Sequence, residues 1–485
     1  MMPTIPYRVI YNQDASHLFS RTIEPITPAH VDEMVDEVAQ GGAELMLINP
    51  NCQRVNYPSN VWQTFWDGIE PGTGQADNLA LIMQKKRLAD QGCNYLTRAL
   101  ERCRQSGMAS GVSVRMNDTH GTPWPDSDAL SDFYTQHSEW RLPGNYMSDG
   151  PYAVIQALDY RQPEVREHYL ALIRELVSDY SFEVLELDFM RSPHFFPQDT
   201  ADQYCDVMTG FVREVRQLLP DGMSLLARVA VTPAAACDLG LDAAAWARED
   251  LVDGIVVTAH FTTAWDMDLG AFRRLVGDDI ALYPGVEFWG YCVDGLQGVM
   301  GLDEILLRGF AAAQYAGGAD GIYLFNFFVA QETGREPLFA ALGQLGDPDG
   351  LRGKAKTYCL MAGSIDGLYT GDGPYQVPRL APLGRPQAFD ILMGAEPAGQ
   401  RVDVEVVVEG NVAGVMEEKA RIHINEHSLG QAASIRPAVL AGAGKDLQTI
   451  KFHASTDMLR PGRNRIVFRN DGEPLTVEQL LVRVR

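Results

Sequence analysis

The sequence lacks several features that would assign the chain to a specialised class. Its 485 residues hold 40 Lys and Arg against 64 Asp and Glu, a formal net charge of −24, which repels phosphate backbones and anionic lipid surfaces. No apolar run approaches the roughly 20 residues of a membrane helix, and the start, MMPTIPYRVIYNQD, does not read as a secretory signal. We therefore expect no nucleic-acid partner, no membrane partner and a cytoplasmic location. Whether the chain forms a homo-oligomer stays open.

Cofactor and metal motifs are also missing. The seven Cys lie far apart and form no CxxC pair, which argues against a disulfide framework and a thiolate zinc site. HExxH, GxSxG, GxGxxG and Walker A motifs are absent, and no Cys nucleophile beside a His is apparent. The Lys residues fall outside the predicted strands, which argues against a Schiff-base aldolase. We expect neither a cofactor nor a metal.

Short β-branched runs alternate with amphipathic helical segments over the first 345 residues or so. This alternation is typical of βαβ units and a parallel sheet. Eight units fit a (β/α)8 TIM barrel better than a doubly wound sheet, which would have a glycine-rich first turn. We predict a catalytic barrel over residues 1–350, with strands at 7–13, 42–50, 110–116, 182–189, 223–231, 254–260, 280–287 and 321–327.

The helical period disappears after about residue 350, and short alternating runs such as RVDVEVVVEG and RNRIVFRN take over. This pattern predicts a small all-β sandwich over residues 351–485. The phrase LRPGRNRIVFRNDGEP resembles a hairpin of the jelly-roll modules that are appended to carbohydrate enzymes. The resemblance implies an accessory domain, either carbohydrate-binding or purely packing.

Two predicted barrel strands end in carboxylates. Strand 4 reads LELDFMR and places Glu186 and Asp188 on the inner face, and strand 7 reads YPGVEFW and places Glu287 at the mouth. Two carboxylates on opposed walls of one pocket are what glycoside hydrolysis needs. Two other interpretations stay open: that Glu186 lies a layer deeper and pairs with Arg115 or Arg228, and that Asp188 and Glu287 form structural ion pairs.

Further polar groups follow the same strand ends. Strand 3 ends in RMNDTH, which brings Asn117, Asp118 and His120 to the rim, where they could bind sugar hydroxyls. The strand-end arginines either clamp an anionic group on the substrate or neutralise Glu186 and Asp188. The remaining candidates for substrate binding are Arg115, Arg191, His260, Trp289 and Asn326.

Tryptophan is concentrated in the predicted strand-to-helix loops. Aromatic faces offer a surface on which a pyranose ring can stack, and a core role would scatter these residues among helices and strands. Six of the seven Trp fall in such loops: Trp62, Trp66, Trp124, Trp140, Trp265 and Trp289.

A strand 3 ending in RMNDTH, followed by a strand 4 ending in LELDFMR, resembles the glycoside-hydrolase-like (β/α)8-barrel superfamily. In its large clan of retaining glycosidases the acid/base ends strand 4 and the nucleophile ends strand 7, which implies Asp188 and Glu287. The Asn-Glu pair of that clan is replaced here by Leu187 and Asp188. In the similar α-galactosidase-like superfamily an Asp ending strand 4 is the nucleophile, and Asp266 or Asp268 would have to supply the acid.

The resemblance implies an O-glycoside hydrolase that uses Asp188 and Glu287 and acts on an oligosaccharide or another small molecule without a cofactor. Two alternatives remain. One is a barrel lyase or isomerase that acts on an acidic sugar through the same rim. The other is a glycan-binding protein without catalysis.

Overall fold

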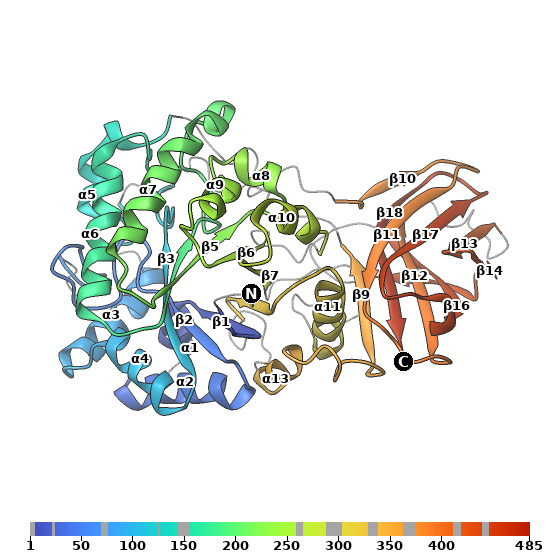
Figure 1. The fold of residues 1–485 in the computed structure, drawn as a ribbon, viewed down its shortest axis with the longest axis horizontal. Helices are drawn as coiled ribbons and strands as arrows, with labels where there is room; N and C mark the ends of the chain where they lie inside the picture. The colour runs from blue at the N-terminus through green and yellow to red at the C-terminus, as the bar shows by residue number, and fades with distance from the viewer. Residues whose placement is uncertain are drawn as a thin grey trace.

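The computed structural model describes residues 5–21, 25–68, 76–124, 126–143, 156–258, 265–287, 303–327, 338–361, 375–410, 419–438 and 446–485. Eight parallel strands close into a barrel in chain order (Figure 1), which confirms the predicted (β/α)8 architecture. The strands are shorter than the sequence runs that predict them. They are β1 (Val9–Gln13), β2 (Leu45–Ile48), β3 (Ala109–Arg115), β4 (Val184–Asp188), β5 (Ser224–Val229), β6 (Gly254–Val257), β7 (Ala281–Glu287) and β8 (Ile322–Phe325).

Helices surround the barrel (Figure 1). In α2 (Pro28–Gly41), Val31, Met34, Val35 and Val38 recur at helical spacing and are buried. The other helices are α1 (Ala15–Arg21), α3 (Ala76–Asp90), α4 (Tyr95–Gln105), α5 (Asp132–Gln136), α6 (Pro163–Asp179), α7 (Cys205–Leu218), α8 (Pro233–Cys237), α9 (Ala243–Arg248), α10 (Leu269–Val276), α11 (Glu304–Ala316) and α13 (Leu342–Leu345). Short 3-10 turns are η1 (Ser138–Trp140), η2 (Gln198–Tyr204), η3 (Phe339–Ala341) and η5 (Thr456–Met458). No helix among these ranges is long and apolar enough to cross a bilayer.

The barrel interior changes from apolar to charged along its axis. Its lower part is a cluster that includes Ile10, Leu47, Val184 and Tyr323. Nearer the carboxyl ends of the strands, the inward side chains are polar and then charged, because alternate residues of each strand face inward. The strand register pairs Ser113 with Glu186, Arg115 with Asp188, and Asp188 with Arg228. Buried charge therefore collects at the carboxyl end of the barrel, which we call the mouth.

The C-terminal part is an antiparallel sandwich, as predicted. One sheet has the order β10-β18-β12-β16-β15 with β9 paired to β18, and the other has the order β11-β17-β13-β14. The strands are β9 (Lys356–Leu360), β10 (Arg379–Ala381), β11 (Gln387–Met393), β12 (Arg401–Glu409), β13 (Ala420–Ile424), β14 (His427–Gln431), β15 (Ser434–Ala438), β16 (Leu447–Ser455), β17 (Gly462–Asn470) and β18 (Leu475–Val484).

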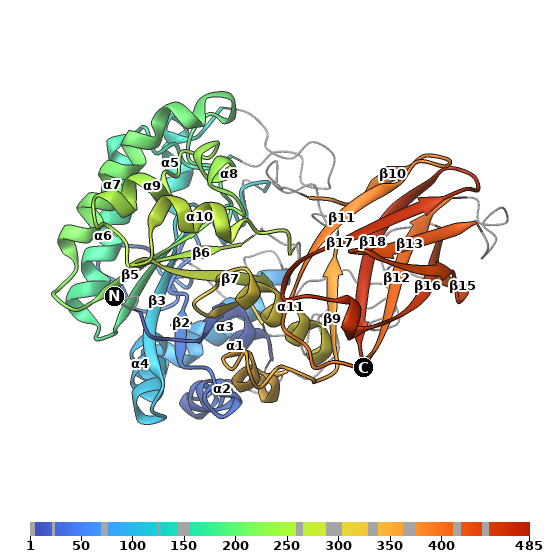
Figure 2. The same cartoon turned by 45° about the vertical axis from the view of Figure 1, so that its right-hand side comes forward.

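The sandwich packs against the barrel along α11, which lies between the barrel strands and β9 (Figure 2). Gly309 of α11 makes the close approach possible, because a Cβ at this position would overlap the backbone oxygen of Thr357 in β9. Gln376 adds a polar contact, since its backbone and side-chain N–H groups donate to the Asp266 carboxylate at 3.2 Å each.

Candidate active site

The two candidate catalytic carboxylates meet at one arginine. Arg228 Nη1 donates to both oxygens of Asp188, at 3.0 and 3.1 Å, and Nη2 donates to Glu287 Oε1 at 2.8 Å. The side chains of Asp188 and Arg228 are 0% exposed and that of Glu287 is 1% exposed. Burial lowers the pKa of Arg228, but the charges of Asp188 and Glu287 outweigh burial and raise it above its usual value. The group therefore holds one fixed positive charge between two carboxylates.

Contacts around this group fix its geometry. The Arg228 guanidinium lies over the Phe325 ring at 3.6 Å from the centroid. Asp188 Oδ1 also accepts hydrogen bonds from the backbone N–H groups of Met190 and Arg191, both at 3.0 Å. The carboxylate that ends β4 thereby anchors the turn that carries Arg191 toward the rim.

Glu186 lies one layer below, and no cationic side chain among the described residues donates a hydrogen bond to it. Its Oε1 accepts from Asn12 Nδ2 at 3.0 Å, Ser113 Oγ at 2.6 Å and Tyr323 Oη at 2.9 Å. Burial, reinforced by the charge of Asp188, raises the pKa of Glu186 to about 7. Glu186 lies in the deeper layer of the barrel, as one of the two interpretations expected. The predicted pairing of Glu186 with Arg115 or Arg228 is wrong, because neither arginine donates a hydrogen bond to it in the described part of the chain.

Arg115 is committed to two other carboxylates. It donates to Asp14 at the end of β1 and, at 3.2 Å, to Asp118 Oδ2. Asp118 Oδ1 in turn accepts from the backbone N–H of His120 at 2.9 Å and contacts His120 Nδ1 at 2.7 Å. Arg191 Nη2 reaches His120 Nε2 at 2.8 Å. Of the two roles foreseen for the strand-end arginines, the neutralising role applies to Arg228, which forms an ion pair with Asp188 and acts on Glu186 through its charge alone. Arg115 forms its ion pairs with Asp14 and Asp118 instead.

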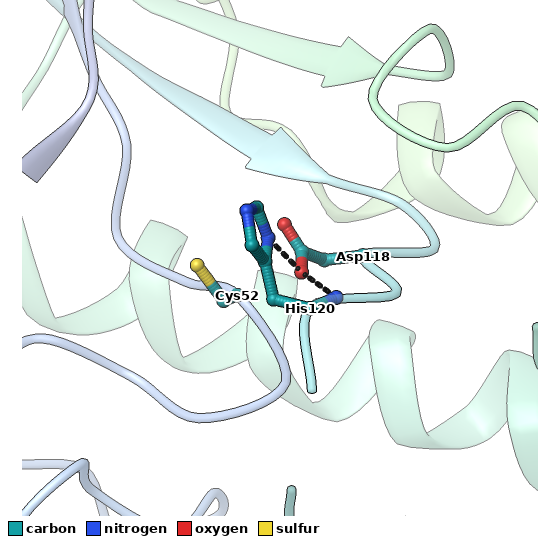
Figure 3. A group of neighbouring side chains, drawn as sticks. All are labelled: Cys52, Asp118 and His120. Carbon is teal, nitrogen blue, oxygen red and sulfur yellow. Dashed lines mark hydrogen bonds and ion pairs between the residues drawn. The ribbon is translucent and has the colours of Figure 1, made fainter. Parts of the chain in front are cut away.

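Cys52 joins this rim, and sequence reasoning missed it. Its Sγ, a ring nitrogen of His120 and a carboxylate oxygen of Asp118 lie within 4.8 Å of one another, and among the described residues they form the one group with the spacing of metal ligands (Figure 3). The signal was available: Cys52 follows β2 and His120 follows β3, and loops after adjacent barrel strands meet at the mouth.

The remaining predicted site residues differ in their contacts and exposure. Asn117 holds loops together: its Nδ2 donates to the carbonyls of Leu158 at 2.8 Å and His194 at 2.5 Å, and its Oδ1 accepts from the Leu158 backbone at 3.1 Å. Asn326 follows β8, is 7% exposed and has a left-handed φ of 46°. His260 and Trp289 lie outside the described residues.

The loop tryptophans do not form one platform. Trp62 is 6% exposed and stacks on His168 at 4.1 Å, so its ring is part of the packing against α6. Trp140 stacks on His137 at 3.6 Å. Trp124 is exposed, at 44%. Among these three residues, Trp124 is the most exposed.

Trp265 lies elsewhere, in a cavity of about 320 Å³ between the barrel and the sandwich. Asp266, Gln314, Gln376 and Arg463 also line it. Burial raises the pKa of Asp266 to about 6. Asp266, which was a candidate for the acid, thus lies at the interface between the barrel and the sandwich, where its carboxylate accepts two hydrogen bonds from Gln376.

Comparisons with known proteins reach only as far as the fold. No protein-family model matches the sequence, and no curated protein matches it significantly. Among solved structures, the chain is similar to the PgaB (BpsB) glycoside hydrolase domain from Bordetella bronchiseptica, with 10% identity over 71% of this chain and 99% of that chain and a TM-score of 0.45.

Two further similar structures are longer proteins. The α-L-fucosidase isoenzyme 2 from Paenibacillus thiaminolyticus is 11% identical over 70% of this chain and 49% of its own, with a TM-score of 0.44. The α-galactosidase AgaA from Geobacillus stearothermophilus is 12% identical over 93% of this chain and 55% of its own, with a TM-score of 0.41. The chain thus spans about half the length of these two enzymes. The eight-stranded parallel barrel rests on the strand pairing of the chain itself, and the roles of its residues rest on the geometry above.

Proposed function

We propose that the chain hydrolyses an O-glycosidic bond at the barrel mouth, with Asp188 and Glu287 as the carboxylate pair. The observation that supports this most is the single guanidinium that binds both carboxylates. The carboxyl groups are separated by no more than one guanidinium and two hydrogen bonds. In glycosidases the two catalytic carboxyl groups lie about 5 to 9.5 Å apart. A separation of one guanidinium and two hydrogen bonds does not exceed this range.

The charges of the group suit acid and base roles. Two carboxylates and one guanidinium leave one negative charge uncompensated, so one carboxylate can take up a proton and leave the group neutral. Asp188 accepts hydrogen bonds from three N–H-bearing groups, the Arg228 guanidinium and the Met190 and Arg191 amides, which stabilise its negative charge. We assign Asp188 the role of nucleophile or base, and Glu287 that of proton donor to the leaving oxygen.

The test compares D188N and E287Q on a panel of aryl glycosides. Each variant should lose about 10²- to 10⁴-fold in kcat/KM while its circular dichroism and urea midpoint stay near those of the wild type. Because an activated leaving group needs no proton, E287Q should lose much less on dinitrophenyl glycosides than on unactivated ones, whereas D188N should lose equally on both.

A matched control for these variants is E405Q, which changes a buried carboxylate of the sandwich and should leave the activity unchanged. Full activity in D188N or in E287Q would remove that residue from the mechanism.

The cationic rim favours one second candidate, a lyase or isomerase acting on an acidic sugar. Arg191 and His120 lie beside each other at the mouth and could bind a substrate carboxylate. Such an enzyme would yield an unsaturated or rearranged product. The appearance of ultraviolet absorbance from a new double bond, without a new reducing end, would replace the hydrolase proposal with this one.

A further inference from the structure

The rim group of Cys52, Asp118 and His120 carries an inference that is independent of the glycosidase proposal. Cys52 is partly exposed, and the His120 side chain is 48% exposed, so both are within reach of solutes. Figure 3 shows the imidazole between the thiol on one side and the Asp118 carboxylate on the other. The arrangement therefore offers a nucleophilic atom at the surface of the mouth.

Positive groups surround the thiol. Arg115 Nη1 lies 3.3 Å from Cys52 Sγ. The charge of Asp118 raises the pKa of His120 to about 9 against burial and the charge of Arg191, but His120 Nε2 lies 2.8 Å from Arg191 Nη2 and can accept this hydrogen bond only in the neutral ring. Lys85, from α3, is buried against the Phe65 ring at 3.5 Å from its centroid.

The balance of charge around Cys52 is positive. The cations that face it are Arg115, Arg191 and Lys85, and the anions are Asp14 and Asp118. Burial lowers the pKa of Lys85 to about 8, which still leaves it mostly protonated at neutral pH. Reactive cysteines occupy electropositive, partly exposed surroundings of this kind, because the thiolate is the nucleophile.

The same surroundings argue against a metal ion. Asp118 already binds Arg115 and His120, and Arg115 also contacts the thiol. A divalent cation would have to displace a guanidinium and lie beside further positive groups. The donor set alone would suit a soft divalent ion, but the charge around it suits an anion.

We propose that Cys52 is a nucleophilic thiol that forms a covalent bond with a small, negatively charged electrophile at the barrel mouth. The probe is iodoacetate. The Cys52 thiol releases its proton to solvent, its sulfur forms a bond to the methylene carbon, and the carbon–iodine bond breaks with iodide leaving as the anion. The electrophile's carboxylate lies toward the cations of the rim.

The experiment alkylates the full native chain with iodoacetate or with uncharged iodoacetamide and follows each cysteine by peptide mass spectrometry. Cys93 is the internal control, because it is also partly exposed and burial raises its thiol pKa. At about pH 7, Cys52 should react about tenfold faster than Cys93. The ratio of iodoacetate to iodoacetamide rates should also be higher at Cys52 than at Cys93.

Two histidine variants separate activation from simple exposure. H120Q should slow the alkylation of Cys52 several-fold and lower its preference for iodoacetate. H137Q is the matched control, because His137 Nδ1 contacts the Glu139 carboxylate at 3.0 Å at an exposed position, and it should change neither quantity. Equal rates at Cys52 and Cys93, no preference for iodoacetate, or stoichiometric Zn²⁺ binding that C52S abolishes would each overturn the proposal.

Discussion

The barrel mouth and strand β12 of the sandwich both bury carboxylates, but the charge of these carboxylates is compensated in opposite ways. On β12 of the sandwich, Asp403 and Glu405 are 0% and 1% exposed, and their Arg and Lys partners reach in from the surface with side chains 17 to 59% exposed. In the mouth, Arg228 is as fully buried as Asp188 and Glu287.

The two arrangements differ in what they cost on folding. A long cationic side chain that lies over a sheet keeps much of its hydration while its stem covers apolar surface. Burying both partners removes the hydration of each, and an apolar replacement of similar volume is often as stable. Burial of both partners also occurs in the sandwich, where Lys356 and Glu396 form an ion pair at 2.7 Å with side chains 0% and 2% exposed, so a role of the mouth group in chemistry rests on its position at the carboxyl ends of the strands.

Arg228 should give the largest effect in a test of this contrast. R228M leaves two buried carboxylates without a cation and should lower the free energy of unfolding by about 3 to 5 kcal/mol. The matched change in the sandwich is K451M, which should cost about 1 kcal/mol or less, because Asp403 keeps His453 and Arg485 as partners. Urea denaturation of the full chain measures both. Equal losses in the two variants would show that the two regions do not differ energetically.

The contrast also shows how far sequence reasoning reaches. The barrel strands were predictable because each is a short β-branched run between turn signals, and the alternation along β4 placed Glu186 and Asp188 on the inner face. The partners of these residues were not predictable in the same way. Which inward residues share a layer depends on the stagger of neighbouring strands around a closed barrel. That stagger places Ser113 level with Glu186, and Arg115 level with Asp188.

The rim shows a second reason for partial success. Asp118 and His120 were candidates because they follow the end of a strand. Cys52 follows β2 after a short irregular segment, and no His lies near it in the sequence. Loop conformation brings the thiol to 3.3 Å from Arg115. Loop conformation has the opposite effect on Trp62, which turns back to pack on His168.

Glu186 should show the next largest effect, in the pH dependence of stability. Its pKa is raised to about 7 in the folded chain, so its contribution to stability is complete below the unfolded pKa of about 4.3 and is lost as pH rises through 7. The wild type should thus lose on the order of 3 kcal/mol relative to E186Q between about pH 5 and 9. Unfolding curves across this range measure it. A parallel pH dependence in the two proteins would mean that Glu186 is ionised throughout.

Asp266 extends the comparison to the interface between the two regions. Burial raises its pKa to about 6, so its protonated form is favoured in the folded chain and stability should fall as pH rises through 6. D266N should therefore gain about 2 kcal/mol relative to the wild type between about pH 4 and 8. Thermal unfolding at several pH values measures this gain. A constant difference would show that Gln376, which donates two hydrogen bonds to Asp266, compensates the charge fully.

Asp403 should give the smallest effect, with the opposite sign. Burial acts to raise its pKa, but Lys451, His453 and Arg485 outweigh burial and lower it. Its contribution is therefore present above the unfolded pKa of about 3.9 and is lost as pH falls through the folded value. D403N should cost about 1 kcal/mol or less at neutral pH, and this cost should vanish in acid, where D266N and the wild type also converge. If D403N instead becomes more stable relative to the wild type as pH rises, the partners of Asp403 do not offset the cost of burying its charge. Asp403 would then resemble Asp266 at the interface.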